Sequence, residues 1–378
     1  MRVEDSQKGW LDKLVSHMDI DGEEDVVQYL REDLQNMREL TGKQIESWKL
    51  LEGRRLTHIH SSPFCAASVL DDWNLACQQS QSFKQYTSAE STSRCDPNSP
   101  VSDLQPAMQV LEENLGSLRQ LSGGAVVPCI CLLSVAHDHF VQQLKTHSGC
   151  LAKVLRVQYN TDDTSAIEVV DHVSVDLMQS EQSWVLQAEH LTDYQAMLRL
   201  GSSLQSLKLP LMYVDCNEYD CPLPTQAELQ ARTKLFASLL LAVQSLRIGG
   251  VLVLHVPTLL TRFSVGVLYI LHKIFTQVTL LGTPQGDGLK YEVNIYCQSY
   301  RGAYSALTQY LWEVYNVIAS SPVGSTEREV LQLIPIAQLC ESSFNQPIAT
   351  FNCKVLSQQT KAIVRAELGN TSQMSGQL

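Results

Sequence analysis

The segment from Lys208 to Arg301 constrains the fold most, because short apolar runs alternate there with longer amphipathic ones. Four runs rich in β-branched and apolar residues are predicted to be strands: LKLPLMYVD, RIGGVLVLHV, QVTLLG and KYEVNIYC. Between them, residues 225–246 and the run TRFSVGVLYILHKIF have the apolar spacing of helices. Such alternation is typical of βαβ units in an open, mostly parallel sheet. The sequence therefore predicts an α/β, Rossmann-like domain.

The N-terminal part differs from this segment, because its apolar residues form stripes with helical spacing. One stripe contains Trp10, Leu11, Leu14 and Val15, and the other contains Val26, Val27, Leu30, Leu34 and Met37. We expect a helical segment over 1–76, including a basic loop, that packs on a neighbouring domain either in this chain or outside it.

Composition divides the rest of the chain. Residues 77–103 are rich in Ser, Gln, Thr, Asn and Pro, which predicts a linker or long loop. We expect the Rossmann-like domain over 104–301, with further strands at CICLLS, LAKVLRVQY and AIEVVDHVSV and a long helix over 182–207. Helices packed on this domain are expected over 302–367, and a disordered tail over 368–378.

The overall composition excludes several classes of protein. The formal net charge of −12 argues against nucleic-acid affinity spread over the whole surface, although it allows a local basic patch. No uninterrupted apolar run approaches the ~20 residues that cross a bilayer, and the N-terminus has no signal-peptide pattern. The eleven cysteines include no CxxC pair. We expect reduced thiols in a protein of the nucleus or cytoplasm, with no membrane association.

A basic cluster precedes the turn-prone sequence Ser-Ser-Pro. It comprises Arg54, Arg55, His58 and His60. Such a run is either a solvated loop or a contact to phosphate or RNA. Against the acidic background of the chain, it is the best candidate for an RNA contact.

Cofactor signals are weak around the first predicted strand of the Rossmann-like domain. A glycine-rich turn normally follows this strand and lets the backbone approach a nucleotide-type cofactor. Here the run from Val135 to His139 contains no glycine, and each Cβ blocks that approach. Asp162 or Asp163, after the second strand, could bind ribose hydroxyls or could be ordinary loop acids.

Two further groups of polar residues could carry chemistry. His137 and His139 do not share a helical face and have no apparent third ligand, so we predict no metal site. Asp215, Glu218 and Asp220 follow a predicted strand, where open α/β sheets place ligands. They could hold a general base or a cation, or they could form a solvated loop.

The order LMYVD, helix, GGVLVLHV, helix, QVTL and YEVNIYC resembles the FtsJ/RrmJ-type ribose 2′-O-methyltransferases. This resemblance implies a Lys-Asp-Lys-Glu tetrad, with S-adenosylmethionine (SAM) as the methyl donor. Asp215 matches the aspartate and Glu292 matches the glutamate, whereas His255 stands where the second lysine is expected. Residues 104–124, where the first lysine is expected, contain no lysine.

A closer resemblance involves LLEGRRLTHIHSSPFC, GGVLVLHVPTLLTRFSVGVLYILHKIF and EVLQLIPI. Together these segments are similar to the C-terminal half of adrift-type mRNA-cap 2′-O-methyltransferases, which methylate the second transcribed nucleotide. In that family an active FtsJ-like domain is followed by a methyltransferase-like domain without the catalytic residues. The resemblance implies that this chain lacks the catalytic half.

Three hypotheses follow. In the first, the chain is a degenerate FtsJ-type domain that supports the catalytic domain of the same enzyme, contributes to capped-RNA binding and binds no cofactor. In the second, it is an active SAM-dependent 2′-O-methyltransferase with an altered tetrad. Histidine, unlike lysine, is mostly neutral at pH 7 and would supply little positive charge there. In the third, it is an unrelated Rossmann-like interaction protein. The first hypothesis accounts best for the missing glycines and lysines.

Overall fold

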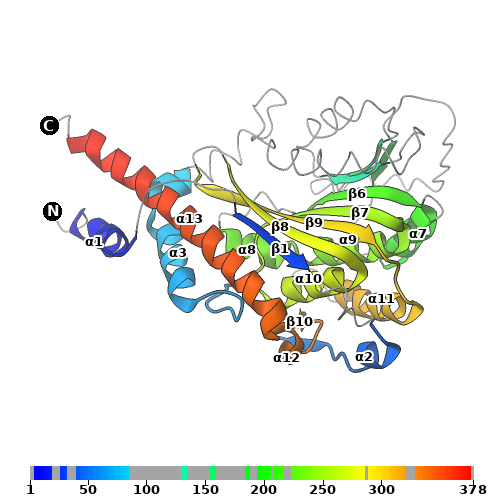
Figure 1. Ribbon diagram of the computed structural model, residues 1–378. Helices are drawn as coiled ribbons and strands as arrows, with labels where there is room; N and C mark the ends of the chain where they lie inside the picture. Colours follow the sequence, from blue (N-terminus) through cyan, green and yellow to red (C-terminus); the bar gives the residue numbers. More distant parts are fainter. Residues whose placement is uncertain are drawn as a thin grey trace.

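The fold centres on an eight-stranded mixed sheet (Figure 1). The structure, a computed structural model, describes residues 4–18, 26–31, 40–85, 129–133, 154–158, 184–187, 194–205, 208–216, 223–285, 288–320 and 328–375. The strands of the sheet are β1 (Val26–Arg31), β3 (Cys129–Leu133), β4 (Val154–Gln158), β5 (Trp184–Gln187), β6 (Leu209–Asp215), β7 (Leu246–Val256), β8 (Phe275–Gln285) and β9 (Lys290–Tyr300). Their order across the sheet is β1-β8-β9-β7-β6-β3-β4-β5.

The strand order confirms the predicted Rossmann-like class. The five strands β5, β4, β3, β6 and β7 are parallel neighbours, and the chain proceeds outward from β3 in one direction and then from β6 in the other. The order therefore reverses between β3 and β6, which is where doubly wound sheets bind ligands. Strand β9 is antiparallel to both β7 and β8 and completes the central part of the sheet.

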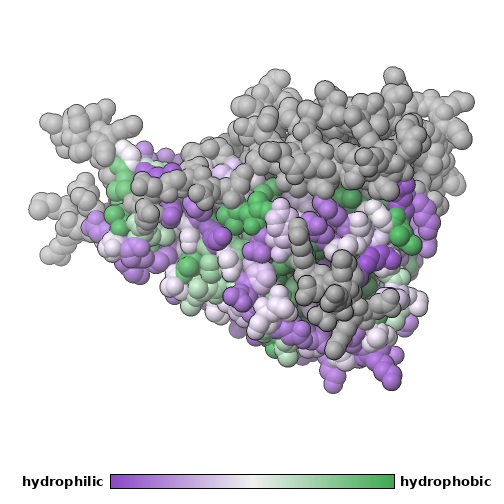
Figure 2. Space-filling model, viewed as in Figure 1, coloured by the Kyte–Doolittle hydropathy of each residue, from purple (hydrophilic) through white to green (hydrophobic). Residues whose placement is uncertain are grey.

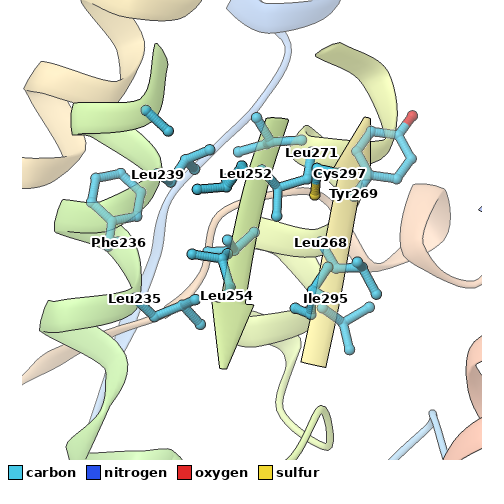
Figure 3. Close-up of a cluster of buried hydrophobic side chains, with 14 of the residues drawn as sticks. Leu235, Phe236, Leu239, Leu252, Leu254, Leu268, Tyr269, Leu271, Ile295 and Cys297 are labelled. Atoms are coloured by element: carbon cyan, nitrogen blue, oxygen red, sulfur yellow. The ribbon is translucent and has the colours of Figure 1, made fainter. Parts of the chain in front are cut away.

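One face of the sheet is covered by helices that the periodicity of the sequence had predicted. Side chains of α9, α10 and α11 share a buried core with β6–β9, and α7 contributes Met197. Figure 3 shows Leu235, Phe236 and Leu239 of α9 opposite Leu252 and Leu254 of β7. These helices are α7 (Tyr194–Gln205), α8 (Pro224–Gln230), α9 (Arg232–Ser245), α10 (Arg262–Ile274) and α11 (Ser305–Ser320). Residues 104–128, at the start of the predicted Rossmann-like domain, lie outside the described residues.

Strand β7 is buried on both faces. Leu252 and Leu254 face the helical core, whereas the alternate residues Val253 and His255 are at most 1 % exposed. Central strands of parallel sheets lose both faces to packing, which explains the nearly continuous apolar run VLVLHV.

A second, two-stranded sheet pairs distant segments of the chain. Strand β2 (Leu51–Gly53) pairs antiparallel with β10 (Glu329–Gln332). The short helices α2 (Gly42–Glu46) and α12 (Ile336–Leu339) lie nearby, below the main sheet in Figure 1. Figure 2 shows that this lower part of the molecule presents mainly hydrophilic and neutral residues on the face in view.

The prediction of a helix through Val26–Met37 was wrong over 26–31, which form β1. This strand pairs with β8 at the edge of the sheet, with Val26 opposite Gly282 and Leu30 opposite Val278. Val26 and Leu30 are buried, whereas Val27 and Tyr29 are exposed. A spacing of four residues fits a helical stripe and one face of a strand equally well, and pairing with β8 decides between them.

The helix predicted over 182–207 was also wrong in part. Residues 184–187 form β5, the outermost strand of the parallel half of the sheet, and the helix α7 starts at Tyr194. The strand predicted at AIEVVDHVSV lies outside the described residues.

The C-terminal helix α13 (Ser342–Ser375) joins the N-terminal segments to the sheet. Its residues Phe351 and Val355 share a core with Val26 and Leu30 of β1. A Cβ at Gly282 of β8 would lie only 2.5 Å from Cγ2 of Val355, so only glycine permits this close approach. The helix runs on through 368–375, so the prediction of a disordered tail from 368 was wrong up to Ser375.

The N-terminal helices α1 (Glu4–Val15) and α3 (Ala67–Gln79) pack against the second half of α13 in a core of their own. Trp73 of α3 donates a 2.9 Å hydrogen bond to Gln359 of α13. The apolar stripe of α1, expected to pack on a neighbouring domain, thus has a partner in this chain.

Residues 77–85, which composition assigned to the start of a linker, belong to this folded core. Phe83 is 2 % exposed, and the Ser82 amide donates to the Glu367 carboxylate at 2.7 Å. Residues 86–103 lie outside the described part. No helix in the described residues is both long enough and apolar enough to cross a membrane.

We predict that His272 makes stability pH-dependent below neutrality. Burial, followed by the nearby Arg301 guanidinium, lowers the pKa of His272 from 6.5 to about 4. The unfolded chain therefore binds this proton before the folded chain does, and stability falls as the pH drops from about 7 to 4. The expected contribution is on the order of 2–3 kcal/mol. Urea unfolding across this range should show a shallower pH dependence for His272→Gln, and parallel curves for the two proteins would contradict the assignment.

Candidate functional site

The candidate site lies at the carboxyl ends of β6 and β7. Asp215 is the last residue of β6, and it pairs in register with His255, the penultimate residue of β7. The Cys216 amide donates to the His255 carbonyl at 2.7 Å, which extends the parallel ladder one residue past the end of β6. Two residues singled out from the sequence are thereby brought to the same edge of the sheet.

Strand β9 brings the third tetrad-matching position to this edge. His255 pairs with Asn294, and Glu292 lies two residues from Asn294 along β9, opposite Thr283 of β8. Asp215, His255 and Glu292 therefore lie on the neighbouring strands β6, β7 and β9. The side chains of Asp215 and Glu292 lie outside the described part, so only their backbone positions are known.

The described side chains at this edge are deeply buried. His255 and Cys216 are 0 % exposed and Asn294 is 2 % exposed. The Asn294 Nδ2 amide has no hydrogen-bond partner among the residues that the structure describes. A buried amide donor without a partner is unfavourable by about 1–3 kcal/mol, and such groups cluster at functional or strained positions.

Beyond β7, a buried carboxylate organises the turn that leads into α10. Glu228 of α8 is 3 % exposed and accepts hydrogen bonds from the amides of Leu260 and Thr261, at 3.0 and 2.8 Å. It also accepts from the hydroxyls of Thr258 and Ser264. Because the amides at a helix N-terminus lack partners within the helix, a carboxylate there satisfies them and interacts favourably with the helix dipole.

A second buried charge connects α9 to the β2–β10 pair. Arg232, the first residue of α9, donates from NH1 to Oε1 of Glu329 at 2.5 Å. The same oxygen accepts the Leu56 amide at 2.8 Å. The Arg232 side chain is only 8 % exposed and its guanidinium lies 5.7 Å from the centroid of the Phe263 ring. Its Nε and Nη2 groups have no hydrogen-bond partner among the described residues.

The predicted RNA-contact residues lie in the segment that follows β2. The side chains of Arg54, Arg55, His58 and His60 are all exposed. The two imidazole rings are 5.7 Å apart. Leu56, next to Arg55 along the chain, donates its amide to Glu329 of β10 and so holds this segment against the β2–β10 pair.

Several candidates from the sequence lie outside the described residues. These are His137, Asp138, His139, Asp162, Asp163, Glu218 and Asp220. Among the residues that the structure describes, no three His, Cys, Asp or Glu side chains gather in a way that could hold a metal ion.

Sequence reasoning missed Glu228, Arg232 and Glu329. Their partners lie up to 273 residues away along the chain, so spacing gives no signal of the contacts. Only the start of α10 carried a local signal. Thr261 followed three residues later by Ser264 is typical of a helix N-cap, and Thr261 accepts the Ser264 amide at 3.1 Å.

Comparison with known proteins agrees with the resemblance seen in the sequence. Two proteins described as cap-specific mRNA (nucleoside-2′-O-)-methyltransferase 2, from Mus musculus and Pongo abelii, are each 20 % identical to this chain over 85 % of its length. The chain is similar to the mRNA-cap 2′-O-methyltransferases. It spans only about a third of these relatives, 35 % and 34 % respectively.

Two further matches are shorter or weaker. The Danio rerio protein of the same description is 27 % identical over 35 % of this chain and 17 % of its own length. A solved structure described as a ribosomal RNA methyltransferase from Plasmodium falciparum covers 50 % of this chain and 97 % of its own, at 12 % identity and a TM-score of 0.31. At that score the alignment supports no conclusion about function. No family model matches the sequence.

The relatives' name implies SAM as their methyl donor. At the described edge, the Cys216 amide is bonded to the His255 carbonyl. The side chains of Cys216 and His255 have no exposed surface that a ligand could contact. The turn after β3 and the end of β4, where a cofactor would also bind, lie outside the described residues.

We predict that Glu228→Ala destabilises the protein by about 3 kcal/mol or more, because it leaves several buried donors without an acceptor. Glu313→Ala is the matched control, since Glu313 is exposed and accepts only from Gln309. The control should change stability by less than about 0.5 kcal/mol. Urea unfolding of both variants measures the difference, and an equally small effect of Glu228→Ala would show that the carboxylate is not needed.

Proposed function

We propose that this chain is the methyltransferase-like, C-terminal region of an mRNA-cap ribose 2′-O-methyltransferase that acts on the second transcribed nucleotide. In this proposal it supports the catalytic domain of the same enzyme and helps to hold capped RNA, in the nucleus and cytoplasm. The similarity to the relatives over 85 % of the chain supports the assignment to this class of protein. That extended similarity also argues against an unrelated interaction protein.

The burial of His255 is the observation that carries the non-catalytic role. A group that acts on a ribose hydroxyl must come within about 3 Å of it. His255 occupies the position of the second tetrad lysine and is 0 % exposed, between the Asp215 and Asn294 positions on the two neighbouring strands. A lysine can extend a charged amine from a strand end towards a substrate, whereas this imidazole is enclosed within the fold.

A second candidate is an active methyltransferase with an altered tetrad. The observation in its favour is that Asp215 and Glu292 lie at one edge of the sheet, on strands that flank His255 on either side. In that case Asp215 would have to act on the substrate without a neighbouring lysine.

Calorimetric titration of the folded chain with SAM, and separately with its demethylated product, tests the cofactor side of the proposal. We expect no detectable heat from either compound, because the side chains of Cys216 and His255 at the described edge are fully buried. Micromolar binding of either one would overturn the degenerate-domain proposal.

A methylation assay on capped RNA tests the catalytic side. The chain alone should transfer no methyl group to the second nucleotide, and the Asp215→Asn variant should support the catalytic region of the enzyme as well as the natural chain does. If the chain alone is active and Asp215→Asn abolishes that activity, the second candidate is correct. Association with the catalytic region, measured by co-purification, completes the test of the supporting role.

A further inference from the structure

The β2–β10 pair and the residues around it form a locally basic surface on an acidic protein. We call residues 49–60 and 328–332, with Arg232 and Arg262, the basic ribbon. It contains six lysines and arginines but only two acids, in a chain of net charge −12. The cations are Lys49, Arg54, Arg55, Arg232, Arg262 and Arg328, and the acids are Glu52 and Glu329. Such a local excess of positive charge on an acidic protein requires an explanation.

The strand register places like charges together at one end of the ribbon. Glu329 of β10 pairs with Gly53 of β2, and the two strands are antiparallel. The next residues outward are therefore Arg328 on one strand and Arg54 on the other, followed by Arg55. All three are exposed. Like charges opposite each other on paired strands are destabilising, and an anion bound between them would relieve the repulsion.

The carboxylate of Glu329, at this end of the ribbon, is already paired within the protein. Glu329 accepts from the buried Arg232 guanidinium at 2.5 Å and from the Leu56 amide at 2.8 Å. Among the described residues, Arg54, Arg55 and Arg328 form no salt bridge of their own. The Arg232–Glu329–Leu56 contact thus holds the turn that presents Arg54 and Arg55, and it engages Glu329, one of the two acids of the ribbon.

Arg232 is a second observation that favours an anion near the ribbon. Its side chain is more than nine-tenths buried and its guanidinium lies 5.7 Å from the centroid of the Phe263 ring, yet Nε and Nη2 have no hydrogen-bond partner among the described residues. Buried guanidinium groups are normally fully hydrogen-bonded, and an anion is one partner that would satisfy these donors. Arg232 also begins α9, where the helix dipole adds to the positive potential.

The position of the ribbon connects it to the edge where the sheet would meet a ligand. Arg232 is the first residue of α9, which follows β6 and α8 along the chain. Arg262 is the first residue of α10, which follows β7. Arg262 reaches β10 through a 3.4 Å hydrogen bond to Gln332. The ribbon therefore lies alongside the helix starts that follow the carboxyl ends of β6 and β7.

From these observations we infer that the basic ribbon binds the phosphate backbone of single-stranded RNA, with Arg54, Arg55 and Arg328 as the principal contacts. This inference rests on the proposed function for its choice of polyanion. The exposed imidazoles of His58 and His60, 5.7 Å apart beside these arginines, favour RNA over an inorganic anion, because histidine rings stack on unpaired bases.

Fluorescence anisotropy with a labelled, uncapped 15-nucleotide RNA tests the inference on the full chain. The Arg54→Ala/Arg328→Ala variant should bind about tenfold or more weakly at low salt, since bonds to charged groups contribute at least that much. Its plot of log affinity against log salt should be shallower by about 1.4, because each phosphate contact to a single strand contributes about 0.7. Both substituted side chains are exposed, so folding should be preserved, which circular dichroism can confirm.

A matched control removes the same charge elsewhere. Lys13 of α1 and Lys354 of α13 are exposed and lie outside the ribbon. The Lys13→Ala/Lys354→Ala variant should retain the affinity and salt slope of the natural chain. Equal losses of RNA affinity in both variants would mean that only net charge matters, and would overturn the inference. Unchanged RNA affinity in the arginine variant would also overturn it. Binding to phosphatidylserine vesicles that depends on the arginines, without binding to RNA, would overturn it as well.

The same proteins separate this inference from the proposed function. RNA binding that depends on Arg54 and Arg328, without association with the catalytic region, would support the ribbon and contradict the supporting role. Association that is unaffected by the arginine substitutions, together with unchanged RNA affinity, would support the role and contradict the ribbon.

Discussion

Burial of β7 on both faces is the constraint on which the rest of the structure depends. Its inner residues face α9 and α10, and its alternate residues, Val253 and His255, are equally removed from solvent. The turn that follows this strand is buried as well, so its polar groups need hydrogen-bond partners within the protein. Glu228 provides them, because its carboxylate accepts hydrogen bonds from the amides of Leu260 and Thr261 and from two hydroxyls. The packing of the sheet therefore determines the buried polar chemistry beside its ligand edge.

The same burial gives this edge of the sheet an enclosed environment. The backbone brings Asp215, His255 and Glu292 to adjacent strands. The side chains described there are those of a packed core, with Cys216 and His255 fully buried. The arrangement of strands can be retained by packing alone, whereas reactivity requires exposed, charged groups at the strand ends. This difference is the physical basis of our proposal that the chain supports its enzyme without performing the transfer.

The charged contacts outside the sheet serve a different purpose. Arg232 and Glu329 link the start of α9 to β10, and Leu56 extends the link to the segment after β2. A buried ion pair is weak evidence for added stability, because desolvation offsets most of the attraction. It does, however, impose a single geometry, and here it orders the turn that carries Arg54 and Arg55. The long helix α13 plays the corresponding role for the N-terminal helices, since it contacts both β1 and α3.

The sequence by itself determined the elements whose apolar period was unambiguous. These were β6, β7, β9, α9 and α10, together with the carboxyl edge at Asp215 and the basic character of Arg54 and Arg55. It did not determine β1 or β5, because Val26 and Leu30 fit either period and because four residues such as WVLQ are too few to define one. Only the tertiary structure decided these strands, through pairing with β8 and β4. It alone revealed Glu228 and the Arg232–Glu329 pair, because hydrogen bonds between residues tens of positions apart depend on packing and leave no trace in local spacing.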